Sequence, residues 1–202
     1  MIKKSYKEKI ETIKISKTPQ KLVISISREH GTNGKEIARR VAEKLGMKFY
    51  DKEEMKKYAL SHSLIENNSD DELYRYYLSL DAEKDAIIKQ TETIKSIAAE
   101  GDCIIVGRAS DYILRNNTNL IKIFLYAPLE YRINKVKEIY KDSYKEAKKH
   151  VHDSDKSRSS YYEVVTNQSW GNKENYDLCI NCEIGNDTII KIICEYIQNK
   201  IK

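Results

Sequence analysis

The amino-acid sequence predicts an α/β fold, a five-stranded parallel sheet with helices on both faces. Short apolar segments alternate with segments of helical periodicity, and strands that alternate with helices in this way form parallel sheets buried on both sides. The chain has 202 residues, enough for one substantial core but too few for two full-sized domains. The expected strands are residues 22–26, 48–50, 103–107, 121–127 and 176–181.

The segments between these strands carry helical patterns. A second helix opens with Asp51, and a polar, tyrosine-rich helical excursion extends to about residue 80. Regularly spaced isoleucines predict a long helix over residues 81–99. Pro128 ends the fourth strand, and the sequence predicts one long basic helix over residues 129–151. The polar stretch 152–175 precedes the last strand, and a final helix spans residues 187–201.

The first strand passes through a glycine-containing turn into a helix. Residues 22–45 read LVISISREHGTNGKEIARRVAEKL, and the apolar residues of the second half recur at three- and four-residue spacing. The glycines can adopt positive φ, so backbone N–H groups can surround an anion at a helix terminus, where the dipole favours negative charge. The lysine adds a full positive charge. We predict a phosphate-binding loop formed by Gly31, Thr32, Asn33, Gly34 and Lys35.

This turn matches only half of the nucleotide-binding pattern G-x-x-x-x-G-K-[ST]. Glu29 stands where the pattern has its first glycine, and Glu36 stands where it has a hydroxyl residue. A glycine-containing turn that merely joins a strand to a helix is the alternative. The position of the turn, directly between a buried strand and an amphipathic helix, favours phosphate binding.

The composition of the chain argues against a nucleic-acid-binding protein. The chain has 36 basic and 31 acidic residues, a formal net charge of +5, and no basic block that would indicate duplex DNA binding. Its 15 tyrosines would suit a single-stranded nucleic-acid module, but they are dispersed through helical segments, which favours packing. We therefore expect no specific nucleic-acid partner.

No apolar run approaches the roughly 20 residues of a membrane span, and the charged start of the chain has no apolar region behind it. We expect a cytoplasmic protein with no membrane partner and reduced cysteines. Cys179 and Cys182 form a C-x-x-C within an expected strand, where neighbouring side chains face opposite ways, so core packing is favoured over a zinc or redox site. His150 and His152 are expected to be solvated residues near a helix end.

Charged residues cluster just after the expected strands, where ligands bind in open parallel sheets. Arg28 follows the first strand, Asp51 the second, and Arg108 and Asp111 the third. The helix after the fourth strand carries Arg132. Arg158 lies in the polar stretch before the last strand. Any one of these arginines alone would be read as a surface charge, and their shared placement predicts an anion-binding cleft.

Six motifs in the same order resemble the bacterial cytidylate kinase-like proteins, a branch of the P-loop nucleoside monophosphate kinases. They are ISISREHGTNGKEIA, KFYDKEEM, IIVGRASDYIL, IFLYAPLEYRI, SDKSRSSYYE and NYDLCIN. The resemblance runs from about residue 22 to the end. It implies a P-loop NTPase-type sheet and transfer of the γ-phosphoryl group of ATP, with Mg²⁺, to a nucleoside monophosphate or a similar small phosphorylated acceptor.

The same resemblance divides the chain. Residues 21–202 would form a single P-loop kinase domain, preceded by a polar extension over residues 1–20. Residues 52–100 would be the helical insertion that binds the nucleoside monophosphate, and residues 140–175 the lid region. Tyr161, Tyr162 and Trp170 fall in this lid, where we expect them to pack the lid rather than stack on a base.

Phosphoryl transfer needs two charged phosphates held in line with their repulsion cancelled. By resemblance, Lys35 would hold the β- and γ-phosphates of the donor, and Arg132 and Arg158 would surround the transferring group. A helix-surface ion pair is the alternative for each of these two arginines. Arg108, in the GR pair, would grip the acceptor phosphate through its bidentate fork. Asp51 and Asp111 are placed with Arg108 as acceptor-binding residues.

The chain departs from better-known cytidylate kinases at the metal. Val106 precedes the GR pair where an acidic residue is frequent, and with Glu36 this removes two familiar magnesium contacts. Either water and nucleotide phosphates hold the ion, with help from an acidic residue such as Asp102 or Asp111, or activity is lost. A nucleotide-binding regulator with a degenerate kinase site is thus the alternative function. The metal ligands and the oligomeric state are left open.

Cytidine selectivity is not expected either. After Asp51 the chain has Lys52-Glu53-Glu54-Met55 in place of the threonine- and glycine-rich run of true cytidylate kinases.

Overall fold

The computed structural model describes residues 21–65 and 84–200. The expected polar extension, residues 1–20, and part of the helical excursion, residues 66–80, lie outside the described residues. None of the described helices is long and apolar enough to cross a bilayer.

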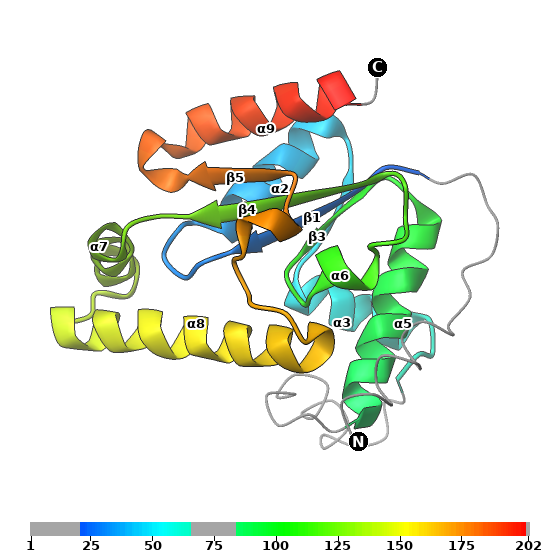
Figure 1. Ribbon diagram of the computed structural model, residues 1–202, viewed down its shortest axis with the longest axis horizontal. Helices are drawn as coiled ribbons and strands as arrows, with labels where there is room; N and C mark the ends of the chain where they lie inside the picture. The colour runs from blue at the N-terminus through cyan, green and yellow to red at the C-terminus, as the bar shows by residue number, and fades with distance from the viewer. Residues whose placement is uncertain (1–20, 66–83, 201–202) are drawn as a thin grey trace.

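Five parallel strands form one sheet in the order β2-β3-β1-β4-β5, which confirms the predicted α/β class. The first strand lies at the centre, and its register places Ile24 beside Ile104 on one side and Ile121 on the other. All five strands point toward the same edge of the sheet (Figure 1). The strands are β1 Val23–Arg28, β2 Lys48–Tyr50, β3 Cys103–Val106, β4 Leu120–Tyr126 and β5 Leu178–Asn181.

Helices cover both faces of the sheet (Figure 1). On one face lie α2 (Gly34–Leu45) and α9 (Asn186–Lys200), which pack on Ile24 and Ile26. The opposite face carries α5 (Lys84–Glu100) and the short α6 (Ser110–Ile113), against Val23 and Ile105. This alternation follows from the two-residue period of a strand, because successive side chains point to opposite faces.

The expected insertion begins with α3 (Lys52–Ser61). Asp51 caps this helix, since its Oδ1 accepts a hydrogen bond from the Glu54 backbone N–H at 3.0 Å. Met55 and Tyr58 pack in the same core cluster as Ile94 of α5. Helix α3 therefore lies beside the carboxyl end of β2, next to the glycine-containing turn.

The prediction of a single long helix over residues 129–151 is wrong. The chain forms two helices, α7 (Leu129–Tyr140) and α8 (Tyr144–Thr166). Lys141 adopts a left-handed conformation with φ of 57°, and Ser143 begins α8 with a capping box in which Ser143 and Glu146 exchange hydrogen bonds. The periodicity of the two helices runs on through the break, so the sequence pattern concealed it.

Helix α8 continues through most of the polar stretch 152–175. Its buried residues share one face although most of its surface is polar, and α7 packs against it through Ile133 and Val136. The chain then passes through two short 3-10 helices, η1 (Lys173–Asn175) and η2 (Cys182–Ile184), on either side of β5.

Of the side chains expected to pack, the aromatic ones and Cys182 do so, whereas Cys179 is only half-buried, and Cys182 lies in η2, beyond the end of β5. Tyr161 and Tyr162 are buried in the core, and the Trp170 ring meets the Phe124 ring edge-on at 5.6 Å. The four cysteines are free thiols, and no group of three or more potential metal ligands occurs in the described part of the chain. His150 lies within α8, half exposed, with its Nδ1 2.8 Å from Asp142.

The glycine-containing turn has little room for side chains. Gly31 has φ of 86°, and a Cβ atom there would lie 2.6 Å from the backbone oxygen of Arg132 on α7. Gly46 also has positive φ, 64°, but a Cβ atom there would meet nothing within 4 Å. A side chain at Gly31 would therefore meet both backbone strain and a close contact, whereas a side chain at Gly46 would meet backbone strain alone.

We predict that G31A lowers the free energy of unfolding by about 2–5 kcal/mol, because left-handed strain of about 1–2 kcal/mol adds to an overlap of about 1–3 kcal/mol. The control G46A should lose only about 1–2 kcal/mol, from the strain alone. Urea unfolding of both variants measures the difference. Equal losses of unfolding free energy in G31A and G46A would show that α7 does not pack closely against the turn.

Candidate active site

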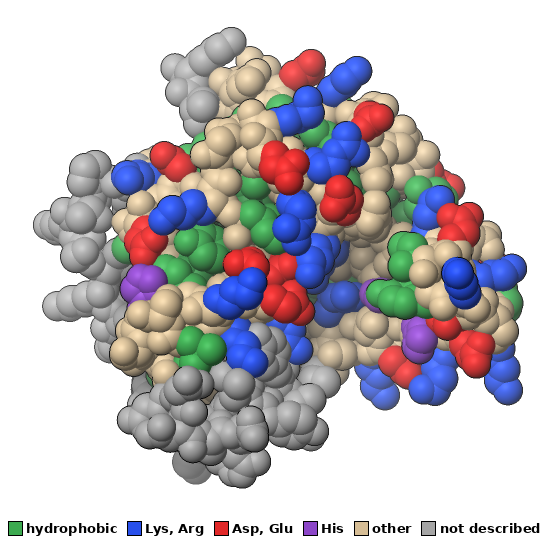
Figure 2. Space-filling model, turned by 180° about the vertical axis from the view of Figure 1, so that it is seen from behind, with side chains coloured by type: hydrophobic (Ala, Val, Ile, Leu, Met, Phe, Trp, Pro, Cys, Tyr) green, Lys and Arg blue, Asp and Glu red, His purple; other side chains and the backbone are tan. Residues whose placement is uncertain are grey.

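Two clefts meet at the carboxyl edge of the sheet. The loop cleft, about 360 Å³, lies between the turn at residues 29–36 and the end of α7. The arginine cleft, about 300 Å³, lies between the residues after β3 and α8. Arg28 and Arg158 line both clefts. Figure 2 shows the molecule hollowed beside the α7–α8 layer, with Lys and Arg side chains gathered at the opening.

The loop cleft has the shape of an anion site. Gly31, Asn33 and Gly34 line it, together with Lys35 and Glu36 at the start of α2. The first backbone N–H groups of an α-helix lack partners within the helix, so this wall offers donors to an anion. Of the predicted loop residues, only Thr32 is buried away from the cleft.

Thr32 holds the turn together. Its hydroxyl donates to the Glu29 backbone oxygen at 2.8 Å, and the side chain is buried. Glu29, in the place of a pattern glycine, accepts a hydrogen bond from the Ala127 backbone N–H at 3.0 Å. The residue that breaks the sequence pattern therefore fastens the turn to the end of β4.

Lys35 is held by two carboxylates in this structure. Its Nζ lies 2.7 Å from Asp51 Oδ2 and 3.1 Å from Glu53 Oε2, with the side chain half exposed. The hydrogen bond that Lys35 donates to Asp51 raises the pKa of Lys35. Burial acts to raise the pKa of Asp51, but the hydrogen bonds from Lys35 and from the Glu54 backbone N–H, with the charge of Lys35, together lower it. To meet a phosphate, the ammonium group has to exchange these partners.

Arg132 is buried and lines neither of the two clefts. Its Nε lies 3.1 Å from Glu29 Oε2, and its Nη1 forms an ion pair with Asp155 of α8. It also donates to the backbone oxygens of Ala127 and His30, at 3.0 and 3.2 Å. The structure thus shows Arg132 in an ion pair, and its expected place around the transferring group stays a prediction.

Asp155 completes this connection to α8. Its Oδ1 accepts hydrogen bonds from the His30 backbone N–H at 2.8 Å and from Arg158 Nη1 at 3.1 Å. Burial, and secondarily Arg158, lowers the pKa of His30 to about 4, so this ring is neutral at neutral pH. One carboxylate therefore links the turn, Arg132 and Arg158.

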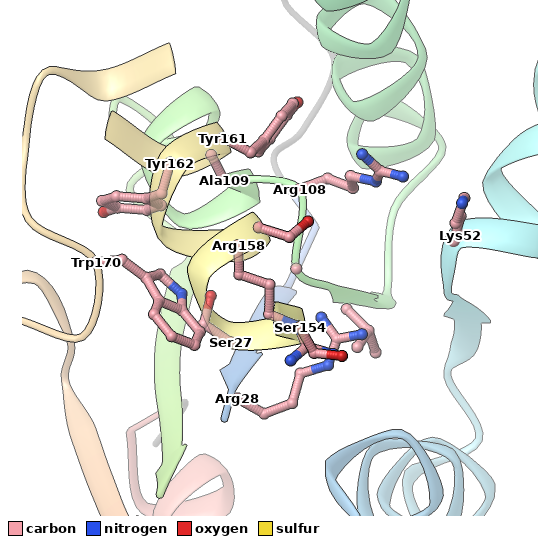
Figure 3. A pocket seen from close by; sticks show the side chains of 13 residues that line it. Ser27, Arg28, Lys52, Arg108, Ala109, Ser154, Arg158, Tyr161, Tyr162 and Trp170 are labelled. Carbon is pink, nitrogen blue, oxygen red and sulfur yellow. The ribbon is translucent and has the colours of Figure 1, made fainter. Parts of the chain in front are cut away.

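The arginine cleft is strongly cationic. Its lining includes four cations, Arg28, Lys52, Arg108 and Arg158, and no carboxylate (Figure 3). The Arg108 guanidinium lies 5.4 Å from the centre of the Tyr161 ring. Burial lowers the pKa of Arg158, and burial together with Arg108 lowers that of Lys52. Such a cleft favours a ligand with more than one negative charge.

Asp111 lies behind the arginine cleft instead of lining it. Its Oδ2 accepts a hydrogen bond at 2.7 Å from the hydroxyl of Tyr162, whose ring lines the cleft. Burial raises the pKa of Asp111 to about 6. Its expected contact with the acceptor stays a prediction; in this structure Asp111 contacts Tyr162, which lines the cleft.

Several cleft residues were not singled out from the sequence. Lys52 directly follows Asp51 at the end of β2, and Ser154 and Ser157 share with Arg158 one face of α8. The three-, four- and seven-residue spacings that join Ser154, Ser157, Arg158 and Tyr161 were the available signal. That signal depends on extending a helix through the polar stretch.

The five-stranded parallel sheet with helices on both faces has a P-loop kinase fold. A shikimate kinase from Acinetobacter baumannii in complex with shikimate aligns with a TM-score of 0.55 at 16% identity, over 90% of this chain and 96% of that chain. A gluconokinase from Sinorhizobium meliloti 1021 aligns with a TM-score of 0.56 at 9% identity, over 90% and 94%. At such identities the likeness shows the fold alone.

A nearer similarity is the crystal structure of an uncharacterized protein from Eubacterium ventriosum ATCC 27560. It is 27% identical, with a TM-score of 0.73, over 90% of this chain and 99% of that chain. The sequence profile of the cytidylate kinase-like family matches residues 23–184, and the chain belongs to that family. Comparison with curated proteins gave no match. The molecule is thus a phosphotransferase of the small-molecule kinase type.

A kinase of this family uses a nucleotide, ATP, typically with Mg²⁺. In the described residues the carboxylates near the loop are scattered: Glu36 lines the loop cleft, while Asp51 and Glu53 hold Lys35. Mg²⁺ commonly keeps several waters and binds through nucleotide phosphates and one or two carboxylates. Glu36, which lines the loop cleft, would supply one such carboxylate, and the ion would neutralise phosphate charge there.

We predict that D111N changes the pH dependence of stability. Because the pKa of Asp111 is raised from 3.8 to about 6, the folded protein binds more protons than the unfolded chain between these values. Stability from this group is therefore present below about pH 4 and lost as the pH rises through 6. The free energy of unfolding of D111N minus that of wild type should rise by about 2–2.5 kcal/mol from pH 4 to pH 7.

Urea unfolding across this range measures the difference, with D187N as the control. Asp187 is an exposed partner of Arg40, and its pKa is lowered, so its titration falls below the range. A D111N difference that stays constant with pH would contradict the prediction.

Proposed function

We propose that the protein transfers the γ-phosphoryl group of ATP to a nucleoside monophosphate or a similar small phosphorylated acceptor. The observation that carries this proposal is the junction of an anion-binding loop with a cleft that has four cations and no lining carboxylate. The triphosphate of ATP would occupy the loop cleft, and the acceptor phosphate the arginine cleft. Arg158, which lines both, would lie beside the transferring group.

The acceptor class follows from charge. A neutral sugar would bring no charge to the four cations that line the arginine cleft, whereas a phosphate monoester brings about two negative charges and oxygen atoms suited to arginine forks. Arg108 is held at the mouth of the cleft by the Tyr161 ring and would bind this phosphate. No lining residue of the cleft argues for cytosine over another base, so the base is left open.

In the reaction an acceptor phosphate oxygen forms a bond to the γ-phosphorus of ATP. The bond from that phosphorus to the oxygen bridging the β- and γ-phosphates breaks, and its electron pair leaves with ADP. An ionised acceptor phosphate needs no general base. The protein supplies position and positive charge, and closure of α8 over the clefts would exclude water.

The ion pairs of Lys35 support a specific alternative. Asp51 and Glu53 hold the lysine that the donor phosphates require. If these pairs persist when nucleotide binds, the protein would be a nucleotide-binding regulator with a degenerate kinase site. In the active enzyme, the phosphates of ATP outcompete the two carboxylates for the ammonium group.

A coupled ADP-release assay with a panel of nucleoside monophosphates tests the proposal. At least one acceptor should stimulate turnover by wild type, and K35A should lower kcat/KM by about 100-fold or more, because it removes a charge at the transferring phosphate. The control K44A changes an exposed lysine of the same helix and should keep wild-type turnover. ATP binding without turnover on any acceptor would favour the regulator.

For Arg158 we expect a separation of binding from chemistry. R158A should lower kcat by about 100-fold or more while the Kd for ATP changes less than about fivefold, because its charge acts mainly in the transition state. Titration calorimetry with a non-hydrolysable ATP analogue provides the Kd. An unchanged turnover number would remove Arg158 from the site.

A further inference from the structure

The side chain of Arg28 occupies the point where the two clefts meet. Arg28 ends β1, the central strand of the sheet, and lines both the loop cleft and the arginine cleft. Only Arg158 shares this position among the residues that line them. A donor phosphate in one cleft and an acceptor phosphate in the other would therefore approach each other beside Arg28.

Two glycines leave the space that this side chain uses. A Cβ atom on Gly34 would lie 2.8 Å from both Cβ and Cγ of Arg28, so the aliphatic stem passes over the start of α2. A Cβ atom on Gly107 would collide with Arg28 Nη1, so the guanidinium lies against the backbone just before Arg108. The glycines of the turn and of the GR pair thus accommodate one arginine that runs between them.

The charge around Arg28 is unbalanced. Within the described residues, its guanidinium has no hydrogen-bond or ion-pair partner. Burial, and secondarily the charges of Arg158 and Arg108, lower the pKa of Arg28 to about 9. The charges of Asp51 and Glu53 act to raise the pKa of Arg28, but neither carboxylate forms an ion pair with it. Both are paired with Lys35. Five donors of a guanidinium are thus available to an anion.

This arrangement differs from that of Arg132, which is buried. Arg132 has two carboxylates and two backbone oxygens as partners, which is what a structural arginine requires. Arg28 has neither, although it is enclosed beside two further guanidinium groups. Keeping three like charges together is unfavourable unless a bound anion compensates them.

We propose that Arg28 is a catalytic residue that contacts the γ-phosphoryl group as it passes from donor to acceptor. This inference rests on the proposed function and adds to it a cation supplied by the central strand. The guanidinium would bind the equatorial oxygens of the transferring group while the new phosphorus–oxygen bond forms and the bond to ADP breaks. It would also offset the repulsion between the donor and acceptor phosphates.

The test compares R28M, which keeps the stem over Gly34 without the charge, with R28K, which keeps the charge without the fork. R40M is the matched control, because Arg40 pairs with Asp187 on the outer side of α2. R28M should lower kcat by about 1,000-fold or more, since arginines at transferring phosphoryl groups contribute on this scale. R28K should recover part of the loss, and R40M should match wild type.

The Kd for ATP and the unfolding midpoint in urea distinguish catalysis from structure. If R28M loses far more in kcat than in ATP affinity, and keeps the unfolding midpoint within about 0.5 M of wild type, the inference stands. A kcat within about threefold of wild type would overturn it. A parallel loss of kcat, ATP binding and folding would also overturn it, because Arg28 would then be structural.

Binding of inorganic tripolyphosphate, followed by titration calorimetry, tests the same side chain without turnover. R28M should bind at least about tenfold more weakly than wild type and R40M equally, because a charged hydrogen bond to phosphate is lost. Unchanged binding by R28M would overturn the inference even if no acceptor were found. Weakened binding in a protein that turns over no acceptor would leave the anion site standing and remove the proposed function.

Discussion

The two clefts take their shape from the buried guanidinium of Arg132 and the carboxylates around it. Arg132 joins Glu29 and the His30 carbonyl of the turn to Asp155 of α8, and Asp155 in turn accepts from the His30 backbone N–H. A buried ion pair of this kind contributes little net stability but strongly disfavours arrangements in which one partner is lost. It therefore fixes where α8 lies over the turn.

The position of α8 in turn determines the electrostatics of the site. Arg158 extends from α8 toward the cations that follow β1 and β3, and these residues share a cleft without a lining carboxylate. Their mutual repulsion is tolerated because the network around Asp155 holds the helix in place. The same repulsion is released when a multiply charged ligand binds, so the structure favours anionic substrates before any specific contact is considered.

Around the loop, in contrast to the arginine cleft, carboxylates neutralise positive charge. Asp51 caps α3 and also holds Lys35, so one side chain both begins a helix and restrains the loop lysine. Glu29 replaces a glycine of the familiar loop pattern, yet it ties the turn to β4 through the Ala127 backbone N–H. A residue that departs from the loop pattern can therefore stabilise the structure of this chain. Such a departure alone does not indicate that the function has been lost.

The strands, their parallel arrangement and the loop were predictable, because alternation of apolar runs and a glycine-containing turn are local features of the chain. The break at Lys141 and the length of α8 were not, since a capping box can interrupt a helical period that otherwise continues. The roles of individual charged residues were also beyond the sequence. The sequence does not distinguish Arg132 from Arg158. Only the structure shows that Arg132 forms buried ion pairs and that Arg158 lines a cleft.

By itself the sequence determined the class of fold, the family and, apart from Lys52, the cations at the carboxyl edge, because these depend on residue types and their order. The tertiary structure alone decided which of those cations are neutralised. Carboxylates from α3 and α8, distant in sequence, reach Lys35 and Arg132, while Arg28 is left facing two clefts. Charge pairing depends on distances of a few ångströms through a low-dielectric interior, and such distances are set only when the helices pack.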